Sequence, residues 1–237
     1  DSRSRRERGL PGGMELVYGE VPEQVPLEEN GVRFLAPVYQ GQKTGWFYDH
    51  RMSRARLAAW VAGKSVLDVY SSIGGWGIQA AAFGALQVCC LDSSAQALAG
   101  VMANAELNGL QDRVNTIQGS ATETMAEMRT EGHRFDVVIL DPPAFIQRKK
   151  DLKKGIAAYR RINELALQLL GPGGLLVSAS CSMHLSRPDL ILALQQAAVR
   201  AGCQLRVVEQ GAQGPDHPIH PAIPETEYLK AVFARKL

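Results

Sequence analysis

The sequence predicts an α/β protein built on a doubly wound, mostly parallel sheet. Short apolar segments alternate with helix-forming segments from residue 65 to residue 235, and this alternation is typical of parallel strands joined by helices. A glycine-rich turn follows the first of these apolar segments. The chain has 237 residues, 46% of them hydrophobic, which is enough for one substantial core. We therefore expect one main domain, and we find no internal repeats.

Seven strands are expected in the sheet. The last two are expected to form a hairpin, which makes the final strand antiparallel. The strands are expected at residues 66–70, 88–91, 114–118, 135–140, 174–180, 204–209 and 228–235. The helices are expected at residues 93–108, 121–131, 156–170 and 188–202, after an alanine-rich helix that begins at the glycine turn. Upstream of the sheet, we expect a strand at 31–38 and a helix at 52–62.

Residues 1–30 are rich in charge and are interrupted by proline and glycine, so we expect an N-terminal arm or linker remnant there and a single domain over 31–237. No apolar run is long enough to span a bilayer and no signal peptide is recognisable, so the expected location is cytoplasmic. The four cysteines form no C-x-x-C pair and have no histidine at ligand spacing, so no metal site is expected.

Charge is unevenly distributed along the chain, although the net charge is only +2. Residues Arg148 to Arg161 contain seven basic side chains and one acid, Asp151. A basic run on a nearly neutral protein favours a docking face for a polyanion. A solvated loop and helix face remains an equally good interpretation of this run.

The strand at 66–70 and its glycine turn predict a cofactor site. Three glycines form the turn: Gly74, Gly75 and Gly77. They let a ligand approach the backbone, and Asp92, at the end of the second strand, is placed to accept hydrogen bonds from ribose hydroxyls.

The position of Asp68 favours S-adenosylmethionine over a nicotinamide cofactor. A dinucleotide fingerprint needs G-x-G-x-x-G directly after the strand. Here Asp68 lies inside the strand, and five residues separate it from Gly74. A carboxylate would repel a pyrophosphate but attract the ammonium of an amino-acid moiety. An ordinary glycine turn without a ligand is the alternative.

Two later strand ends carry candidate reactive groups. Asp141 begins the rigid turn Asp141-Pro142-Pro143-Ala144-Phe145, which could hold a flat polar substrate such as a nucleobase by hydrogen bonding and stacking. Cys181 follows the strand at 174–180, and a thiolate there could add to C6 of a pyrimidine to activate C5 for methylation. The alternatives are a helix-capping Asp141 and a Cys181 that only fills space.

Several motifs occur together in one order. They are KTGWFYDHR (43–51), the Gly74-Gly75 turn, NAELNGL (104–110), Asp141-Pro142-Pro143, YRRINELALQLL (159–170), Ser180-Cys181-Ser182, Asp216-His217-Pro218 and Tyr228-Leu229-Lys230. With these motifs, residues 27–237 resemble the catalytic domain of bacterial 23S ribosomal RNA cytosine-5 methyltransferases that carry an N-terminal PUA domain. The resemblance implies a class I, Rossmann-like fold that uses S-adenosylmethionine, with ribosomal RNA as the partner.

The resemblance also implies roles for individual residues. Cys181 would be the nucleophile, and Asp141 would position the base or the methyl donor. The residues implied around the cofactor are Thr44, Phe47, Asp49, Arg51, Asp68, Tyr70, Ser71, Gly74, Asp92, Ser93, Ser120, Ala121 and Asp141. The chain departs from the family at Ser120, where an Asp is usual, and at Ala144, where a Lys is frequent. These 237 residues include no PUA domain, so, unless such a domain was removed from the chain, RNA contact would depend on the basic run at 148–161.

Three functional hypotheses follow. The first is an RNA cytosine-5 methyltransferase that acts through Cys181. The second is an RNA methyltransferase for the exocyclic amine of guanine or adenine, which uses the turn at Asp141 and leaves Cys181 as a packing residue. The third is a non-catalytic RNA-binding protein whose cofactor site has changed, for which Ser120 would be a sign. The modified nucleoside separates the first two, and S-adenosylmethionine binding tests the third.

Overall fold

The computed structural model describes residues 16, 18–39 and 45–237. Nine strands are assigned within these residues. Two form an N-terminal hairpin, β1 (Gln24–Glu29) and β2 (Val32–Pro37). The others form the main sheet: β3 (Ser65–Val69), β4 (Gln87–Asp92), β5 (Val114–Gln118), β6 (Phe135–Leu140), β7 (Leu170–Ser180), β8 (Leu205–Gly211) and β9 (Lys230–Lys236).

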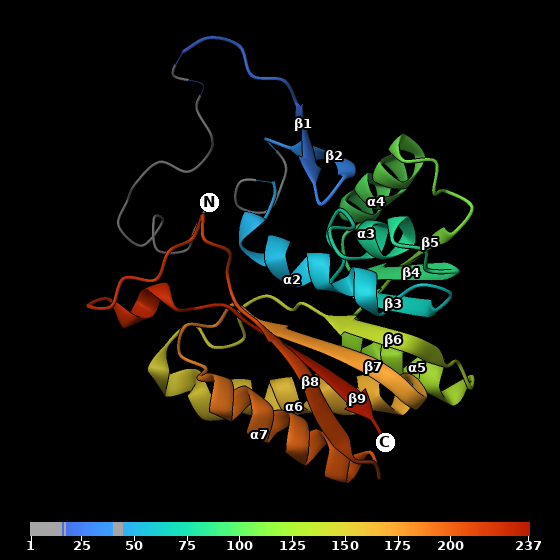
Figure 1. Ribbon diagram of the computed structural model, residues 1–237, viewed down its shortest axis with the longest axis vertical. Helices are drawn as coiled ribbons and strands as arrows, with labels where there is room; N and C mark the ends of the chain where they lie inside the picture. Colours follow the sequence, from blue (N-terminus) through green and yellow to red (C-terminus); the bar gives the residue numbers. More distant parts are fainter. Residues whose placement is uncertain (1–15, 17, 40–44) are drawn as a thin grey trace.

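The main sheet has the order β5-β4-β3-β6-β7-β9-β8 (Figure 1). The pairs β4–β5, β3–β4, β3–β6 and β6–β7 are parallel, and β9 runs antiparallel to both β7 and β8. This confirms the predicted mostly parallel, seven-stranded sheet with an antiparallel last strand. The carboxyl ends of the parallel strands lie at one edge of the sheet. Strands β4 and β5 are added on one side of β3, and β6 and β7 on the other, so the strand order switches between β3 and β6. Ligands bind at such a switch point, beyond the carboxyl ends of the strands.

The α-helices are α2 (Arg51–Ala55), α3 (Gly77–Ala82), α4 (Ala95–Leu107), α5 (Ala121–Thr130), α6 (Leu152–Leu169) and α7 (Arg187–Arg200). Short 3-10 segments are η1 (Tyr48–His50), η2 (Arg56–Ala59), η3 (Lys149–Asp151) and η4 (Pro224–Thr226). Two helices begin at serine caps: Ser94 accepts from the Ala97 amide of α4, and Ser186 accepts from the Asp189 amide of α7. A capping serine satisfies an amide that the helix itself leaves unpaired.

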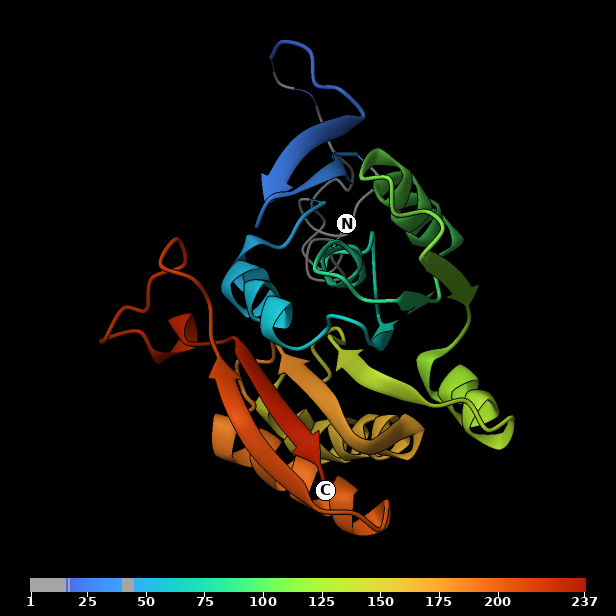
Figure 2. The same ribbon diagram turned by 45° about the vertical axis from the view of Figure 1, so that its right-hand side comes forward.

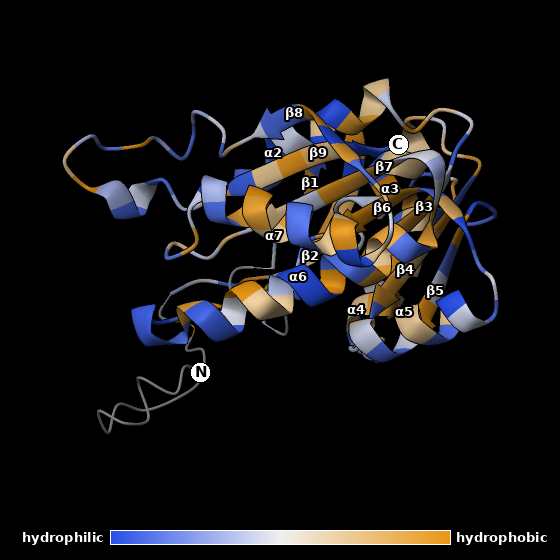
Figure 3. Ribbon diagram, turned by 90° about the horizontal axis from the view of Figure 1, so that it is seen from below, coloured by the Kyte–Doolittle hydropathy of each residue, from blue (hydrophilic) through white to orange (hydrophobic). Residues whose placement is uncertain are grey.

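The sheet is buried on both faces. In Figures 1 and 2, α2, α3 and α4 lie on one side with the β1–β2 hairpin, and α5, α6 and α7 lie on the other. Alternate residues of β6 enter the two cores: Val137 and Ile139 on the α3 side, Val138 and Leu140 on the α6 side. This explains why the central strands β3, β4, β6 and β7 are almost continuously apolar in their buried parts rather than alternating, and Figure 3 shows the middle of the sheet largely in the hydrophobic colour.

The hairpin at the N-terminal end packs against the α3–α4 side of the sheet. Its turn residues Asn30 and Gly31 both have positive φ, 54° and 78°, as expected for a two-residue hairpin turn. The buried side chains of β2 alternate, Val32, Phe34 and Ala36. The expected boundary between arm and domain at residue 30 thus falls in this turn, and residues 1–15 and 17 of the expected arm lie outside the described residues.

Element boundaries differ from expectation in several places: strand β1 lies in the expected arm, and β7 begins at Leu170 instead of residue 174. The helix expected at 52–62 is a succession of η1, α2 and η2 from Tyr48 to Ala59. Helix α6 begins at Leu152 instead of residue 156 and so includes Gly155. Glycine is needed at this position of the helix, because a Cβ there would lie 2.1 Å from the Ile146 side chain. Strands β8 and β9 pair as expected, but β9 also pairs with β7, so the long segment 212–229 leads back into the sheet.

Candidate active site at the carboxyl edge of the sheet

The expected site residues gather at one edge of the sheet. The carboxyl ends of β3, β4, β6 and β7 meet there, and antiparallel β9 begins at the same edge opposite the end of β7. Asp92 ends β4, Asp141 follows β6, and Cys181 follows β7. Strands β6 and β7 are direct neighbours, so Asp141 and Cys181 leave the sheet from adjacent strands.

The turn after β3 has an unusual backbone. Tyr70 and Ser72 are non-glycine residues with positive φ, 64° and 50°. Asp92 holds this conformation, because its Oδ2 accepts a 2.9 Å hydrogen bond from the Ser72 amide. Its Oδ1 accepts from the Ser94 amide at 3.0 Å. Such φ values are costly for side-chain-bearing residues and persist where the surroundings enforce them, frequently at functional sites.

Asp68 is completely buried beneath the glycine turn. Its Oδ2 accepts a 2.8 Å hydrogen bond from the Gly77 amide at the start of α3, and its Oδ1 has no partner among the described residues. Burial, above all, together with the nearby Asp141 and Asp92 carboxylates, raises the pKa of Asp68 to about 8. In this structure Asp68 braces the first turn of α3, and its predicted contact with the cofactor ammonium stays a prediction.

The cradle over Asp68 requires glycine. A Cβ on Gly77 would lie 2.6 Å from the Cys90 sulfur and 3.0 Å from Asp68 Oδ2. Gly74 has φ 88°, and a Cβ there would lie 2.7 Å from Ile78. The buried hydroxyl of Ser71 has no hydrogen-bond partner in the described part of the chain. The glycines let the turn pack closely over Asp68, and the unpartnered polar atoms of Asp68 and Ser71 beside it fit a cofactor with an amino-acid moiety.

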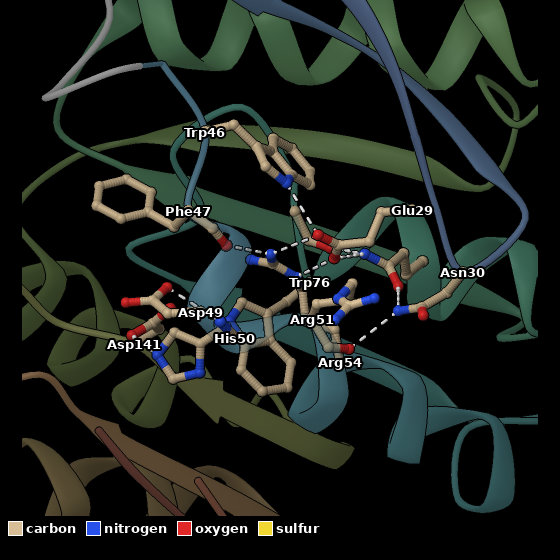
Figure 4. A network of polar contacts seen from close by, with 12 residues as sticks. Glu29, Asn30, Trp46, Phe47, Asp49, His50, Arg51, Arg54, Trp76 and Asp141 are labelled. Atoms are coloured by element: carbon tan, nitrogen blue, oxygen red, sulfur yellow. Dashed lines mark hydrogen bonds and ion pairs between the residues drawn. The ribbon is translucent and has the colours of Figure 1, made fainter. Parts of the chain in front are cut away.

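Asp141 is held between two aromatic side chains. Its Oδ2 accepts a 2.9 Å hydrogen bond from Trp76 Nε1, and its Oδ1 lies 3.2 Å from His50 Nε2 at the distance of an ion pair (Figure 4). Burial alone would raise the pKa of Asp141, but His50 and the two hydrogen bonds outweigh it and lower the pKa below its usual value. Asp141 is therefore an ionised hydrogen-bond acceptor.

The segment 45–51 lies against the long loop before β9. Asp49 is buried and accepts a 2.8 Å hydrogen bond from the Tyr228 hydroxyl. Arg51 is 3.1 Å from Asp216 in the same loop. The Phe47 carbonyl accepts a hydrogen bond from Arg54. Three of the four residues expected to enclose the cofactor from this segment are thus held by side-chain contacts, and the fourth, Thr44, lies outside the described residues.

A buried ion pair joins this segment to the N-terminal hairpin. Arg54 Nε and Glu29 Oε1 are 2.6 Å apart, and a second bond of 3.0 Å joins Arg54 to Oε2 (Figure 4). Glu29 also accepts 2.9 Å hydrogen bonds from Trp46 Nε1 and Gln79 Nε2. Gln79 belongs to α3, so the hairpin is tied directly to the helix that follows the glycine turn.

Cys181 is presented by two fixed neighbours. It is partly exposed, whereas Ser180 and Ser182 have no exposed surface. The Ser180 hydroxyl donates a 2.8 Å hydrogen bond to the hydroxyl of Tyr159, and Ser182 Oγ lies 3.0 Å from that same hydroxyl. Tyr159 is fully buried in α6. A single side chain beneath the sheet edge therefore fixes the backbone on both sides of the thiol.

The remaining expected cofactor residues form the rim near α5. Ser93 and Ser120 are exposed, and Ala121 begins α5. Ser120 occupies the N-cap position of α5, where its hydroxyl lies 3.4 Å from that of Thr122 and not on a helix amide. The Gly119 amide donates to the Asp92 carbonyl at 3.0 Å, which brings this rim beside the end of β4.

The basic run divides into two parts. One part surrounds the start of α6, directly after the turn at Asp141: Arg148, Lys149, Lys150, Lys153 and Lys154, all exposed. Further along α6, Arg161 is paired with Glu164 at 3.4 Å. The cluster at residues 148–154 is the part of the run that neighbours the site.

Residues that sequence reasoning missed complete the site. His50 and Trp76 orient Asp141, Tyr159 fixes the flanks of Cys181, and Lys230 donates a 2.8 Å hydrogen bond to the Ser182 carbonyl. His50 and Lys230 belong to motifs noted in the sequence, which was the available signal. In the described part of the chain no helix is long and apolar enough to cross a membrane, and no group of three or more potential metal-ligating residues is found.

Comparison with known proteins identifies the family. The model of a family described as S-adenosylmethionine-dependent methyltransferase matches residues 5–235. Two relatives are both called ribosomal RNA large subunit methyltransferase I: that of Shewanella denitrificans is 39% identical and that of Aeromonas salmonicida 40%, each over 99% of this chain. The chain spans 60% of the length of these relatives.

Solved structures have the same fold. A SAM-dependent methyltransferase from Streptococcus mutans aligns with a TM-score of 0.82 and 22% identity over 93% of this chain and 57% of its own. SMU.776, a methyltransferase complexed with SAH, gives the same score and identity over 93% of this chain and 58% of its own. With the matching family model and the glycine cradle described above, these findings establish that the chain belongs to the S-adenosylmethionine-dependent methyltransferase family, with S-adenosylmethionine as its cofactor.

Proposed function

We propose that this chain methylates C5 of a cytosine in ribosomal RNA through a covalent adduct with Cys181. The observation that carries the proposal is the partly exposed Cys181 thiol between two fully buried serines. It lies at the sheet edge where β3 and β4, the strands beside the glycine turn, also end. Relatives of about 40% identity named as ribosomal RNA large subunit methyltransferases support RNA as the substrate.

The chemistry requires a nucleophile because C5 of cytosine is not reactive by itself. S-adenosylmethionine, when bound, supplies an electrophilic methyl group. The Cys181 thiolate adds to C6, and the electron pair of the C5–C6 double bond makes C5 nucleophilic toward that methyl group. After the methylated C5 loses its proton to a base, the double bond forms again, the C6–S bond breaks and the thiolate is released.

Asp141 supplies the base recognition in this proposal. Its lowered pKa keeps it ionised, so it can only accept hydrogen bonds. Cytosine presents an amino donor at N4, whereas a uracil-type base presents an oxygen acceptor at the same position. In this proposal the fixed carboxylate at the end of β6, next to the strand that ends before Cys181, selects cytosine over uracil.

The basic cluster at residues 148–154 would hold the RNA backbone next to the site. Its side chains are exposed and follow the Asp141 turn directly. Phosphate contacts of this kind give affinity and orientation without reading sequence. Binding should accordingly weaken steeply as the salt concentration rises.

The test is to incubate the protein with unmodified ribosomal RNA and methyl-labelled S-adenosylmethionine, then digest the RNA and identify the labelled nucleoside. Label in 5-methylcytidine is expected for the wild type and none for Cys181→Ala. Cys203→Ala is the matched control, since Cys203 is also partly exposed but lies beyond α7, away from this edge. C5 methylation by the Cys181→Ala variant would overturn the proposal.

A second readout detects the adduct itself. RNA that contains 5-fluorocytidine cannot lose a proton from C5, so the enzyme stays attached to C6. We expect a denaturation-resistant protein–RNA complex with the wild type and with Cys203→Ala, and none with Cys181→Ala.

The ionised Asp141 also favours a second candidate, methylation of an exocyclic amine. The Asp141-Pro142-Pro143-Ala144-Phe145 turn offers an acceptor next to an aromatic ring, and the Phe145 ring lies 4.8 Å from that of Tyr159. Label in an N-methylated guanosine or adenosine, retained in Cys181→Ala, would support it. Calorimetry with S-adenosylmethionine tests the remaining hypothesis of a non-catalytic RNA-binding protein, which predicts no cofactor binding.

A further inference from the structure

Lys230 begins β9 directly beside the end of β7. In the strand register it lies opposite Ser180, the residue before Cys181. Its Nζ donates a 2.8 Å hydrogen bond to the carbonyl of Ser182, the residue after Cys181. Lys230 therefore contacts the chain on both sides of the thiol, once through the backbone ladder and once through its side chain.

The Lys230 side chain is buried without a carboxylate partner. Only 5% of the residue is exposed, and among the described residues no Asp or Glu lies within ion-pair distance of Nζ. Buried lysines are rare unless they are paired, because removing an ammonium from water is costly. An ammonium has three donors, and the Ser182 carbonyl uses one of them.

Three ionisable groups influence the pKa of Lys230: Arg187 at the start of α7, Cys181 after β7 and Glu227 after η4. Burial, and then Arg187 at the start of α7, lower the pKa of Lys230 to about 8, while Cys181 and Glu227 oppose that shift. Because the ammonium contacts the residue after Cys181 and the Lys230 backbone lies opposite the residue before it, the thiol lies close enough for the two charges to interact. At neutral pH the ammonium remains the major form, and a nearby cation favours the thiolate form of a cysteine.

The other flank of Cys181 is held by neutral groups. The Tyr159 hydroxyl contacts the hydroxyls of Ser180 and Ser182, and the Ser182 hydroxyl accepts from the Ile146 amide at 3.3 Å. None of these groups carries a positive charge. Lys230 thus adds to the surroundings of Cys181 a positive charge that these neutral groups lack.

We propose that Lys230 is a positioning residue for Cys181: its buried ammonium stabilises the thiolate and fixes the Ser182 carbonyl, so that the sulfur is both ionised and correctly presented. The inference rests on the proposed role of Cys181 as the nucleophile. It adds to that role a source for the thiolate, since Asp141, the carboxylate at the end of the neighbouring strand β6, is already engaged by Trp76 and His50.

The test measures thiol ionisation without methyl transfer. The wild type, Lys230→Met and Lys230→Arg are alkylated with iodoacetamide from about pH 5.5 to about pH 9.5, and modification at each cysteine is followed by mass spectrometry. In the wild type we expect Cys181 to react with a midpoint below about 8.5, the value for an ordinary thiol. Cys203, whose pKa is raised by burial, is the internal reference with a higher midpoint.

Lys230→Met should raise the Cys181 midpoint by about one pH unit and slow alkylation near neutral pH about tenfold. Lys230→Arg keeps the cation and should stay near the wild-type profile, whereas a purely packing role predicts no difference in the Cys181 midpoint between the Arg and Met variants. A Cys181 midpoint in folded Lys230→Met equal to that of the wild type would overturn the inference. If Lys230→Met does not fold, a wild-type Cys181 midpoint at or above that of Cys203 overturns it.

The outcomes separate this inference from the proposed function. If Cys181→Ala still forms 5-methylcytidine, the proposed function fails, whatever the alkylation profiles are. If the Cys181 adduct forms but Lys230→Met leaves the alkylation profile unchanged, the proposed function stands and only the role of Lys230 fails.

Discussion

The indole nitrogen of Trp76 donates a hydrogen bond of 2.9 Å to Oδ2 of Asp141. Trp76 precedes α3 in the glycine turn, and Asp141 follows β6, so the bond joins the cofactor turn to the turn expected to hold the substrate base. A change on one side of this bond is transmitted to the other. Trp76 and His50 each hold one oxygen of the Asp141 carboxylate.

Replacing Trp76 with Phe should lower the rate of methyl transfer under conditions in which the variant is still folded. The variant keeps an aromatic ring but loses a hydrogen bond to a charged group, a loss of about 1.5–3 kcal/mol in the free energy of unfolding. Asp141 is then held by His50 alone. Methyl transfer, assayed well below the melting temperature, is expected to fall at least about tenfold.

Trp60→Phe is the matched control. Trp60 Nε1 donates a 2.8 Å hydrogen bond to Glu209 in β8, away from the site. We expect a similar or smaller loss of stability and nearly unchanged methyl transfer. Equal activities of the two variants would contradict a role for the Trp76–Asp141 bond in the site.

Replacing Arg54 with Met should strongly destabilise the protein. It leaves the Glu29 carboxylate, which is 2% exposed, without its cation, and breaking a buried ion pair from one side costs about 3–5 kcal/mol. Urea unfolding measures the change. Arg161→Met, which breaks the exposed pair with Glu164, is the control and should cost no more than about 1 kcal/mol. Similar decreases in the free energy of unfolding of both variants would contradict the prediction that the buried Arg54–Glu29 pair stabilises the fold.

Asp68 should make stability fall as the pH rises. Its carboxyl ionises at 3.8 in the unfolded chain and at about 8 in the fold, so between these values the folded state binds more protons. The free energy of unfolding then decreases with pH in this window, by up to about 1.4 kcal/mol per pH unit. Asp68→Asn removes the contribution and is expected to show a weaker pH dependence from about pH 5 to about pH 8.

Asp136→Asn is the control of opposite sign. The Ser65 amide lowers the pKa of Asp136, so its carboxylate stabilises the fold above the unfolded pKa and loses that contribution only in acid. This variant should be less stable at neutral pH, with an unchanged slope between about pH 5 and about pH 8. A wild-type slope in Asp68→Asn would show that Asp68 does not carry a proton at neutral pH.

Gly77→Ala should disturb the start of α3. The added methyl group would lie 2.6 Å from the Cys90 sulfur and 3.0 Å from Asp68, and overpacking of this kind costs about 1–3 kcal/mol. Calorimetry should also show weaker S-adenosylmethionine binding. The Gly77→Ala, Cys90→Ala double variant relieves one contact and should recover part of the loss. Gly171→Ala, whose Cβ would meet only the Phe135 carbonyl at 3.8 Å, should behave like the wild type.

The sequence predicted the sheet well because its strands are short apolar runs bounded by turn residues. Residues 114–118 and 135–140 are strands with the predicted bounds. Helix α6 was placed too late because Gly155 and the preceding lysines read as a loop. Its contact with Ile146 depends on tertiary packing, which periodicity does not report.

From strand order alone, the positions of candidate site residues could be predicted only where these residues directly follow a strand of the sheet. The position of Asp92, Asp141 and Cys181 at one edge was predictable, since parallel strands bring their carboxyl ends together, while their roles stay predictions. Glu29 was missed because it lies in a segment expected to be an arm, and its partner Arg54 is distant in sequence. Lys230 was missed as a site residue because its proximity to Cys181 depends on the insertion of β9 between β7 and β8.

That insertion has a consequence for the order of folding. Strand β8 pairs with β9 and not with β7, so after β8 is synthesised it has no neighbour in the sheet until residues 230–236 follow. The first five strands of the sheet can assemble earlier, with the cofactor turn among them. The environment of Cys181 is completed last, when β9 enters and carries Lys230 to the end of β7. The cofactor turn therefore depends on strands that precede β9 in the chain, whereas the contacts that Lys230 makes beside Cys181 depend on β9 itself.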